Sequence, residues 1–154
     1  MRRFGALEAM RRRVDVAAIN QTRFGEPMGN CWEACVATLT GFSLSQIPDG
    51  RPDGERTSWE DVRAWLAGRG WLLLFFPVAL TGGRLPIIAG VPYILSGRAP
   101  TGVLHSVVAV DGSTVHNPNP KPGTGLVDAR SVEWLLPITD RGAGELATLQ
   151  EAPI

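Results

Sequence analysis

The residues of this chain with the most chemistry to offer are two cysteines and two histidines. Cys31 follows Gly29 and Asn30 and starts a segment of helical character that ends at Gly41. A thiol in the first turn of a helix faces unpaired backbone N–H groups and the positive end of the helix dipole, and both favour the thiolate. Because the thiolate is the nucleophilic form of cysteine, Cys31 is the candidate nucleophile for covalent acyl transfer.

Cys35 lies one helical turn beyond Cys31, where the helix dipole no longer acts and packing dominates. We therefore interpret Cys35 as a core residue. The alternative is a tetrahedral zinc site of Cys31, Cys35, His105 and His116, since two cysteines and two histidines satisfy the ligand count. The spacing opposes this alternative, because zinc fingers pair their histidines at short helical intervals, whereas these two lie in strand-like sequence around an Asp-Gly turn.

His105 is the candidate base for Cys31. It opens the apolar run 106–110, so its ring can lie at the end of a strand that anchors it. Asn117 closes the next apolar run and could accept the imidazole N–H, which would fix the orientation and tautomer of the ring. Cys31, His105 and Asn117 together would then form a Cys-His-Asn arrangement.

The hairpin at Asp111-Gly112 decides whether His105 and Asn117 can meet. A two-residue loop would place them on opposite faces of the sheet, whereas a three-residue loop, 110–112, would set them directly opposite each other. We predict the three-residue loop. With the two side chains on opposite faces, His116 or Asp111 would have to replace Asn117.

The elements that position these side chains are helices followed by strands. Helical patterns cover residues 4–16, 31–40 and a segment that begins at Ser58, which has capping-box-like spacing to Asp61. Short apolar runs separated by turn residues follow at 71–76, 91–95, 106–110, 114–116 and 132–136. This order is typical of an α+β domain, with the helix that carries Cys31 packed on an antiparallel sheet.

A length of 154 residues suits one domain. We predict a basic N-terminal extension at 1–18, which lacks a strong apolar face and is loosely attached. The domain itself covers 19–139, with an irregular loop at 117–125. Residues 140–154 have no apolar periodicity and are expected to form a flexible tail.

Composition excludes several classes of function. The 15 basic residues balance the 15 acidic ones, so no overall field draws the chain to nucleic acid or an anionic membrane. The longest apolar run, 71–80, is broken by Pro77 and is shorter than the roughly 20 residues of a spanning helix. With no secretion signal, we expect a cytoplasmic protein. No phosphate loop or dinucleotide fingerprint is present, so no cofactor is expected.

Four segments together resemble the papain-like fold, and among its branches the C39-like peptidase group, which includes small bacterial and phage proteins. They are Gln21, Gly29-Asn30-Cys31-Trp32-Glu33-Ala34-Cys35, Leu104-His105-Ser106-Val107-Val108 and His116-Asn117-Pro118. The resemblance spans roughly 21–137 and implies that Cys31 attacks a carbonyl, His105 moves the proton and Asn117 holds the histidine. It also implies that Gln21 donates to the oxyanion beside the Cys31 backbone N–H. For Gln21 the alternative is a turn cap.

The sequence therefore predicts a cysteine hydrolase that cleaves a peptide, isopeptide or related amide bond of a peptide or protein substrate. The group's usual Asp-Cys-Gly is Asn30-Cys31-Trp32 here, which leaves the substrate open. The alternative from another class is a catalytically idle papain-like binding module, such as a virion or scaffold component, whose groove holds a peptide. Tryptophans could line such a groove, although at helical and strand spacing they are more typical of a core.

Overall fold

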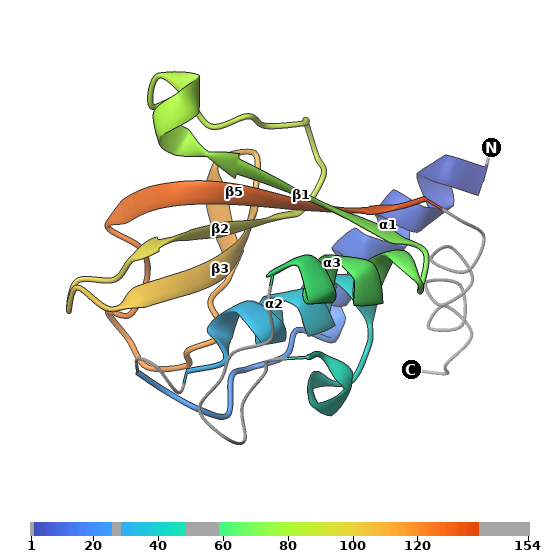
Figure 1. Cartoon of the computed structure of the whole chain (residues 1–154). Helices are drawn as coiled ribbons and strands as arrows, with labels where there is room; N and C mark the ends of the chain where they lie inside the picture. Colours follow the sequence, from blue (N-terminus) through green and yellow to red (C-terminus); the bar gives the residue numbers. More distant parts are fainter. Residues whose placement is uncertain (1, 26–28, 49–58, 139–154) are drawn as a thin grey trace.

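The sheet at the centre of the chain is antiparallel and joins strands that are distant in sequence. A computed structural model describes residues 2–25, 29–48 and 59–138, and among these the strands form one sheet of order β1-β5-β2-β3-β4 (Figure 1). The strands are β1 (Trp71–Pro77), β2 (Tyr93–Arg98), β3 (Leu104–Val110), β4 (Ser113–His116) and β5 (Asp128–Pro137). With the helices described below, the α+β class predicted from the sequence is confirmed.

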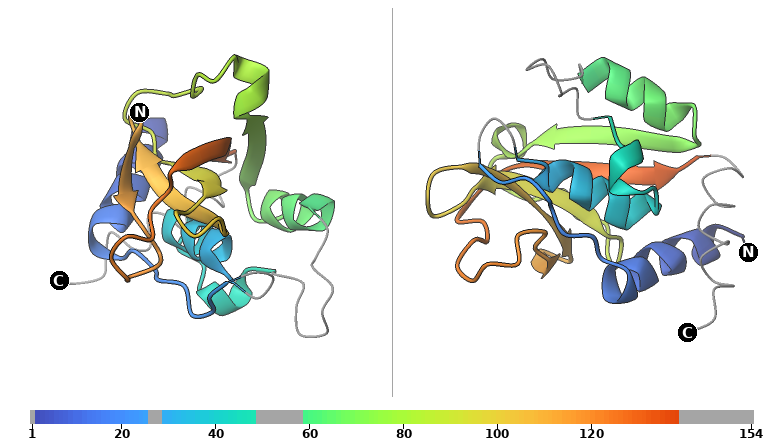
Figure 2. Two further views of the ribbon diagram at one scale, coloured as in Figure 1. Left: turned by 90° about the vertical axis from the view of Figure 1, so that its left-hand side faces the viewer. Right: turned by 90° about the horizontal axis from the view of Figure 1, so that it is seen from below.

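Helices precede and cover this sheet. They are α1 (Arg2–Val16), α2 (Cys31–Thr40) and α3 (Trp59–Ala67), with short 3₁₀ turns η1 (Leu44–Gln46) and η2 (Val78–Thr81). Apolar side chains of all three helices form a core with one face of the sheet, represented by Leu73, Ile94 and Val108. Figure 2 shows α2 lying along that face. The opposite face carries a second cluster around Tyr93 and Trp134.

Helix α2 is buried from end to end. Every residue from Trp32 to Thr40 is buried, and only Cys31, at the first position, is partly open. The helix ends at Gly41, which adopts the left-handed conformation and donates its N–H to the Ala37 carbonyl at 2.8 Å. Both the extent of this helix and its glycine C-cap were predicted from the sequence and are confirmed.

Helix α1 is part of the core, and the predicted loose attachment of the N-terminal extension is wrong. Its buried residues, Ala6, Ala9, Met10 and Val14, recur at helical spacing and pack against α2. The buried stripe is made largely of small residues and lies beside three consecutive arginines, 11–13, which hid it in the sequence pattern. Of these, Arg13 is itself buried, with its guanidinium against Gly41.

The other predicted boundaries differ by a few residues. Strand β2 starts two residues later than predicted, β3 starts two residues earlier and includes His105, and β5 begins at Asp128 rather than at position 132. Helix α3 is described from Trp59 onward, so the predicted cap at Ser58 lies outside the described residues, as does the predicted tail at 140–154. None of the helices in the described ranges is both long and apolar enough to span a bilayer.

The close approach of α1 to the end of α2 gives a stability prediction. Gly41 has φ +79°, and a Cβ there would overlap the Arg13 guanidinium, so Gly41→Ala should destabilise the fold by about 1–2 kcal/mol or more. Gly5 lies within α1 and has open space around its Cα. Gly5→Ala should therefore stabilise by up to about 1 kcal/mol. Urea unfolding of both variants checks the opposite signs, and equal effects would contradict the packing of Arg13 on Gly41.

Candidate active site

A cavity of about 970 Å³ lies beside the first turn of α2 and the start of β3. Its lining includes three of the four residues that the sequence analysis selected, Gln21, Cys31 and His105. Two buried glutamates, Glu33 and Glu133, also line it. The cavity therefore combines a thiol, an imidazole and carboxyl groups within a largely apolar wall.

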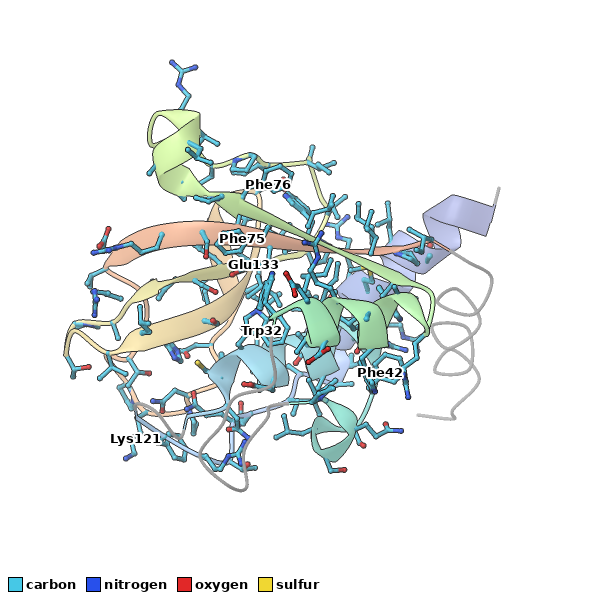
Figure 3. All side chains as sticks on the ribbon, viewed as in Figure 1. Trp32, Phe42, Phe75, Phe76, Lys121 and Glu133 are labelled. Atoms are coloured by element: carbon cyan, nitrogen blue, oxygen red, sulfur yellow. The ribbon has the colours of Figure 1, made fainter. Side chains whose placement is uncertain are left out.

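The aromatic part of this wall comes from three different elements. Trp32 of α2 lies 5.1 Å from Trp59 of α3, measured between ring centroids, and Trp59 lies 5.9 Å from Phe75 of β1. Figure 3 shows Trp32 and Phe75 on the two sides of Glu133. By contrast, Trp71 and Trp134 are buried in the core. The expectation that the tryptophans are core residues holds for those two, whereas Trp32 and Trp59 also line the cavity.

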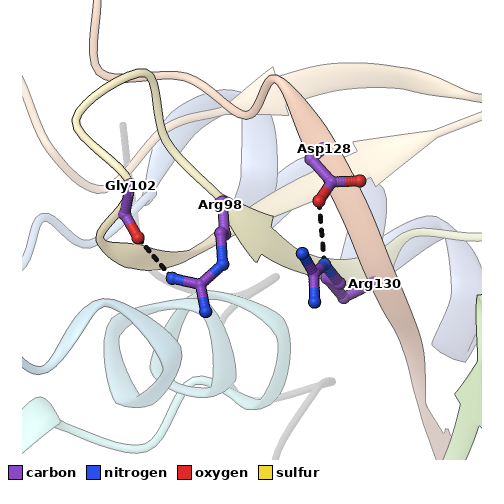
Figure 4. Close-up of polar contacts among 4 residues, drawn as sticks. All are labelled: Arg98, Gly102, Asp128 and Arg130. Carbon is purple, nitrogen blue, oxygen red and sulfur yellow. Dashed lines mark hydrogen bonds and ion pairs between the residues drawn. The ribbon is translucent and has the colours of Figure 1, made fainter.

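The rim of the cavity is braced at the loop between β2 and β3 and at the start of β5. Arg98 donates to the Gly102 carbonyl at 2.5 Å across the loop, and Arg130 pairs with Asp128 at 2.8 Å (Figure 4). At Gly97 the two strands approach so closely that a Cβ would overlap the Asp128 carbonyl. Glycine at this position thus allows β2 and β5 to stay paired through the register shift between Ser96 and Gly97.

His105 is held by Asn117, as the sequence predicted. The His105 Nε2 lies 2.7 Å from Asn117 Oδ1. This oxygen also accepts the Asn119 backbone N–H at 3.0 Å, and the Asn117 Nδ2 donates to Thr124 Oγ1 at 3.0 Å. These two contacts fix which end of the amide is the acceptor, so Nε2 carries the proton. Nδ1, which makes no hydrogen bond within the described residues, is left with the lone pair that a base needs.

The predicted loop of this hairpin is wrong, and a bulge restores the predicted contact. Val110 pairs with Ser113, so the loop is the two-residue Asp111-Gly112, with φ of 50° and 84°. The register then shifts, because Ala109 pairs with Thr114 but Val108 pairs with His116, leaving position 115 as an extra residue. One extra residue reverses the alternation of the side chains that follow. Asn117 is thereby returned to the face of the sheet that His105 occupies.

Cys31 lies beside the residue that follows His105. Ser106 and Trp32 line the same cavity as Cys31, and hydrogen-bond contributions from the backbone of both and from the Ser106 hydroxyl act to lower the pKa of its thiol. Burial nevertheless raises the pKa of the Cys31 thiol, and the negative charge of Glu33 raises it further. The predicted preference for thiolate is therefore not found. Desolvation at the floor of the cavity outweighs the hydrogen bonds that favour the charged form.

The imidazole is also neutral at rest. Burial lowers the pKa of His105, while the hydrogen bond to Asn117 opposes this shift only in part. Within the described residues no hydrogen bond joins the His105 ring to the Cys31 sulfur. The two groups therefore share one cavity as a neutral thiol and a neutral imidazole.

Gln21 is fixed next to the same cavity by the chain that precedes α2. It is buried, and its backbone N–H donates to the Pro118 carbonyl at 3.0 Å. Its Nε2 donates to the Arg23 carbonyl at 2.8 Å, which is the turn-capping contact that the sequence left as the alternative. Among the described residues the second hydrogen of Nε2 has no acceptor, and the buried Oε1 has no donor.

Asn30 closes the segment before Cys31, a role that the sequence analysis missed. Its Oδ1 accepts the backbone N–H groups of Thr22 and Arg23 at 3.0 and 2.9 Å, and its Nδ2 donates to Thr22 Oγ1 at 3.0 Å. His116 adds a fourth tie at the other end, since its Nε2 donates to the Ile19 carbonyl at 2.8 Å. These bonds seat the start of α2 against the end of β4.

The two side chains considered as substitutes for Asn117, of which His116 was also a possible zinc ligand, have other partners. His116 is bound to Ile19, and Asp111 accepts the Gly90 N–H at 2.8 Å at the hairpin turn. Cys35 is fully buried within α2, as expected for a core residue. Among the described residues there is no group of three or more His, Cys, Asp or Glu side chains that could hold a metal ion.

A buried polar network behind Cys31 was not predicted. Ser106 Oγ lies 2.8 Å from Ser96 Oγ, Ser96 donates to Glu133 Oε2 at 3.2 Å, and Ser131 donates to Glu133 Oε1 at 3.0 Å. Burial raises the pKa of Glu133 to about 7, although the two hydroxyl donors lower it. The only signal in the sequence is that these polar residues interrupt apolar strands.

No protein-family model, curated protein or solved structure matches this chain. The geometry of the cavity and its side chains is therefore what a functional assignment depends on.

The contact between His105 and Asn117 predicts a change in titration. The Asn117 oxygen accepts more strongly from imidazolium than from imidazole, so Asn117→Ala should lower the pKa of His105, by about one unit for a lost charge-assisted hydrogen bond. Histidine ring shifts followed by NMR between pH 4 and 8 measure this. Asn119→Ala is the matched control, because within the described ranges its side chain accepts from the Lys121 backbone alone. An unchanged His105 titration in Asn117→Ala would contradict the contact.

The buried carboxyl of Glu133 predicts a pH dependence of stability. Its pKa is raised from 4.5 to about 7 in the folded state, so the folded chain keeps this proton to a higher pH than the unfolded chain does. The free energy of unfolding should therefore fall by about 3 kcal/mol between pH 4.5 and 7 and stay lower above that range. Glu133→Gln should abolish this loss. Denaturant unfolding at pH 5 and pH 8 tests it, with Asp128→Asn as an exposed control.

Proposed function

We propose that this chain is a papain-like cysteine hydrolase that cleaves a peptide, isopeptide or related amide bond through a thioester on Cys31. The observation that carries the proposal is the 2.7 Å contact between His105 and Asn117 at the cavity that also holds Cys31 at a helix start. Nucleophile, base and the group that orients the base come from α2, β3 and the residue after β4. Such a constellation is defined by its geometry and not by order in the chain.

The first half of the reaction forms the thioester. With a carbonyl carbon of the substrate above Cys31, Nδ1 of His105 takes the thiol proton as the sulfur adds to that carbon. The tetrahedral oxyanion is stabilised by the Cys31 backbone N–H, which belongs to the first turn of α2, and by the second amide hydrogen of Gln21. When the carbon–nitrogen bond breaks, His105 gives its proton to the departing amine.

The second half uses the same groups with water in place of the thiol. His105 removes a proton from water as its oxygen adds to the thioester carbon, and the sulfur leaves with that proton as a neutral thiol. The acid product then departs. An amine in place of water would give acyl transfer through the same steps.

A neutral resting pair is compatible with this chemistry. The raised pKa of Cys31 and the lowered pKa of His105 both come mainly from burial, which costs the charged forms and leaves the neutral forms in place. His105 then acts as a general base during attack. Bound substrate supplies the oxyanion and ordered contacts that are absent at rest.

A catalytically idle papain-like binding module is the second candidate. Two observations favour it: the thiol is held neutral, and an aromatic wall of Trp32, Trp59 and Phe75 lines the cavity. Such a module would hold a peptide or protein segment, as a virion or scaffold component does, without cutting it. It would need neither the Cys31 sulfur nor the His105 ring.

Matched cysteine variants separate these candidates. We expect Cys31→Ala to abolish turnover of a fluorogenic peptide library, with the covalent adduct to a peptidyl vinyl sulfone lost in parallel. Cys35→Ala should retain both activities, because Cys35 is buried in the core, and should lose about 1 kcal/mol or more of stability through the deleted sulfur. His105→Ala should lower turnover by about 10²–10⁴-fold. Library binding without turnover, unaffected by Cys31→Ala, would overturn the hydrolase in favour of the binding module.

A further inference from the structure

A line of hydroxyl groups joins the Cys31 thiol to the buried carboxyl of Glu133. Ser96 pairs with Ser106 on one side and with Ser131 on the other, and Glu133 lies two residues beyond Ser131 on the same strand. These side chains therefore share the face of the sheet that α2 covers. Glu133 pairs with Ile94, whose side chain packs in the core that includes α2, and Figure 3 labels Glu133 between Phe75 and Trp32. Ser106 lines the cavity together with Cys31 and is the member of the line that acts on the pKa of the Cys31 thiol.

The protons available in this line fix its direction. Each serine hydroxyl has a single hydrogen to donate. When Glu133 is ionised, Ser96 donates to Glu133 Oε2 at 3.2 Å, so the 2.8 Å contact requires Ser106 to donate to Ser96. The Ser106 hydroxyl then has no hydrogen left for the Cys31 sulfur and can only accept from it, so that only the Ser106 backbone still favours the thiolate.

Protonation of Glu133 allows the whole line to reverse. A neutral carboxyl donates to Ser96, Ser96 donates to Ser106, and Ser106 is left with its hydrogen for the Cys31 sulfur. A hydroxyl that donates to sulfur favours the thiolate. Apart from the proton bound at Glu133, no covalent bond forms or breaks, and the serine O–H groups only rotate. The protonation state of Glu133 thereby changes the hydrogen bonding at Cys31.

We propose that Glu133 is a positioning residue which, through Ser96 and Ser106, sets how readily Cys31 loses its proton. The significance of this role rests on the proposed function, since it acts on the nucleophile. The members of this line are buried or half-buried, where a hydrogen bond is electrostatically stronger than in water. A change in the protonation of Glu133 therefore alters the ease with which Cys31 loses its proton, through the hydroxyl groups of Ser96 and Ser106.

Other groups that face Cys31 and Glu133 do not form part of this line. Helix α2 contributes Glu33, whose charge acts on Cys31, and Cys35, whose pKa responds to Glu133. His105 of β3 and Arg130 of β5 line the same cavity. The parts of β1 and α3 that line it are uncharged aromatic rings.

The test is the rate of Cys31 alkylation by iodoacetamide in the full chain, read by mass spectrometry at pH 5.5 and pH 8.5. At pH 5.5 Glu133 of the parent chain is protonated, so Glu133→Gln should alkylate at the parental rate. At pH 8.5 the parent line points away from sulfur, and Glu133→Gln should react about tenfold faster. A merely structural effect would change the rate at both pH values by the same factor.

Two serine variants separate the hydrogen-bonded line from simple charge repulsion. Ser96→Ala leaves the Glu133 charge in place but frees Ser106 to donate to sulfur, so it should reproduce the tenfold gain at pH 8.5, and the double variant should add nothing further. Ser131→Ala removes the hydrogen bond to the other carboxyl oxygen, Oε1, which lowers the pKa of Glu133. The pH-dependent change in the alkylation rate should therefore persist in this variant but occur at a higher pH than in the parent chain. A parental rate for Ser96→Ala at pH 8.5 would overturn the proposal.

Reciprocity supplies a readout that needs no alkylation. If Glu133 affects the ionisation of Cys31, then Cys31→Ala must change the pH at which Glu133 titrates, as followed by carboxyl ¹³C shifts. An unchanged Glu133 titration would overturn the coupling. The failure of the hydrolase assignment can be told apart from the failure of the coupling. If the chain turns over no substrate, but the ratio of the Glu133→Gln alkylation rate to the parental rate still depends on pH, only the proposed function is lost. If the chain turns over substrate and this ratio is the same at both pH values, only the coupling is lost.

Discussion

Burial of α2 along its whole length is the constraint on which the rest of the structure depends. Nine consecutive residues of this helix are buried, so packing on every side fixes its position against the sheet. One end is held by Arg13 and the left-handed Gly41, and the other by the hydrogen bonds of Asn30. Cys31 is therefore set at a defined place beside the start of β3. The same burial makes its thiol difficult to ionise.

How much of the structure could be predicted depended on how local the signal was. The helix at 31–40 was readable because its apolar run and its terminal glycine are contiguous in sequence. The attachment of α1 was not, because Ala6, Ala9 and Met10 are small or flexible and stand beside charged arginines. The partnership of His105 and Asn117 was predicted for a wrong reason. A loop of two residues and a bulge together gave the alternation that one longer loop would have given, and a bulge has no clear mark in a single sequence.

The polar residues behind Cys31 show a different limit. Ser96, Ser106 and Glu133 belong to three strands, and only the antiparallel order that places β2 between β5 and β3 makes them neighbours. Taken one at a time, each reads as the solvent-facing residue of its strand. The raised pKa of Glu133 likewise arises from burial, which depends on what α2 covers. A site built from pairings between distant strands is visible only once the register of the sheet is known.

The place of β5 in the sheet also has a consequence for the order in which the protein can fold during its synthesis. Strands β1 and β2 do not pair with each other and join one sheet only through β5, which lies between them and is the last strand in the described part of the chain. As the chain leaves the ribosome, α2 and the His105 hairpin emerge before the strand that carries Ser131 and Glu133. Domains dominated by such long-range pairings fold late and slowly. The floor of the cavity is thus completed last, and a nascent chain holds its cysteine without the polar network behind it until synthesis has passed Pro137.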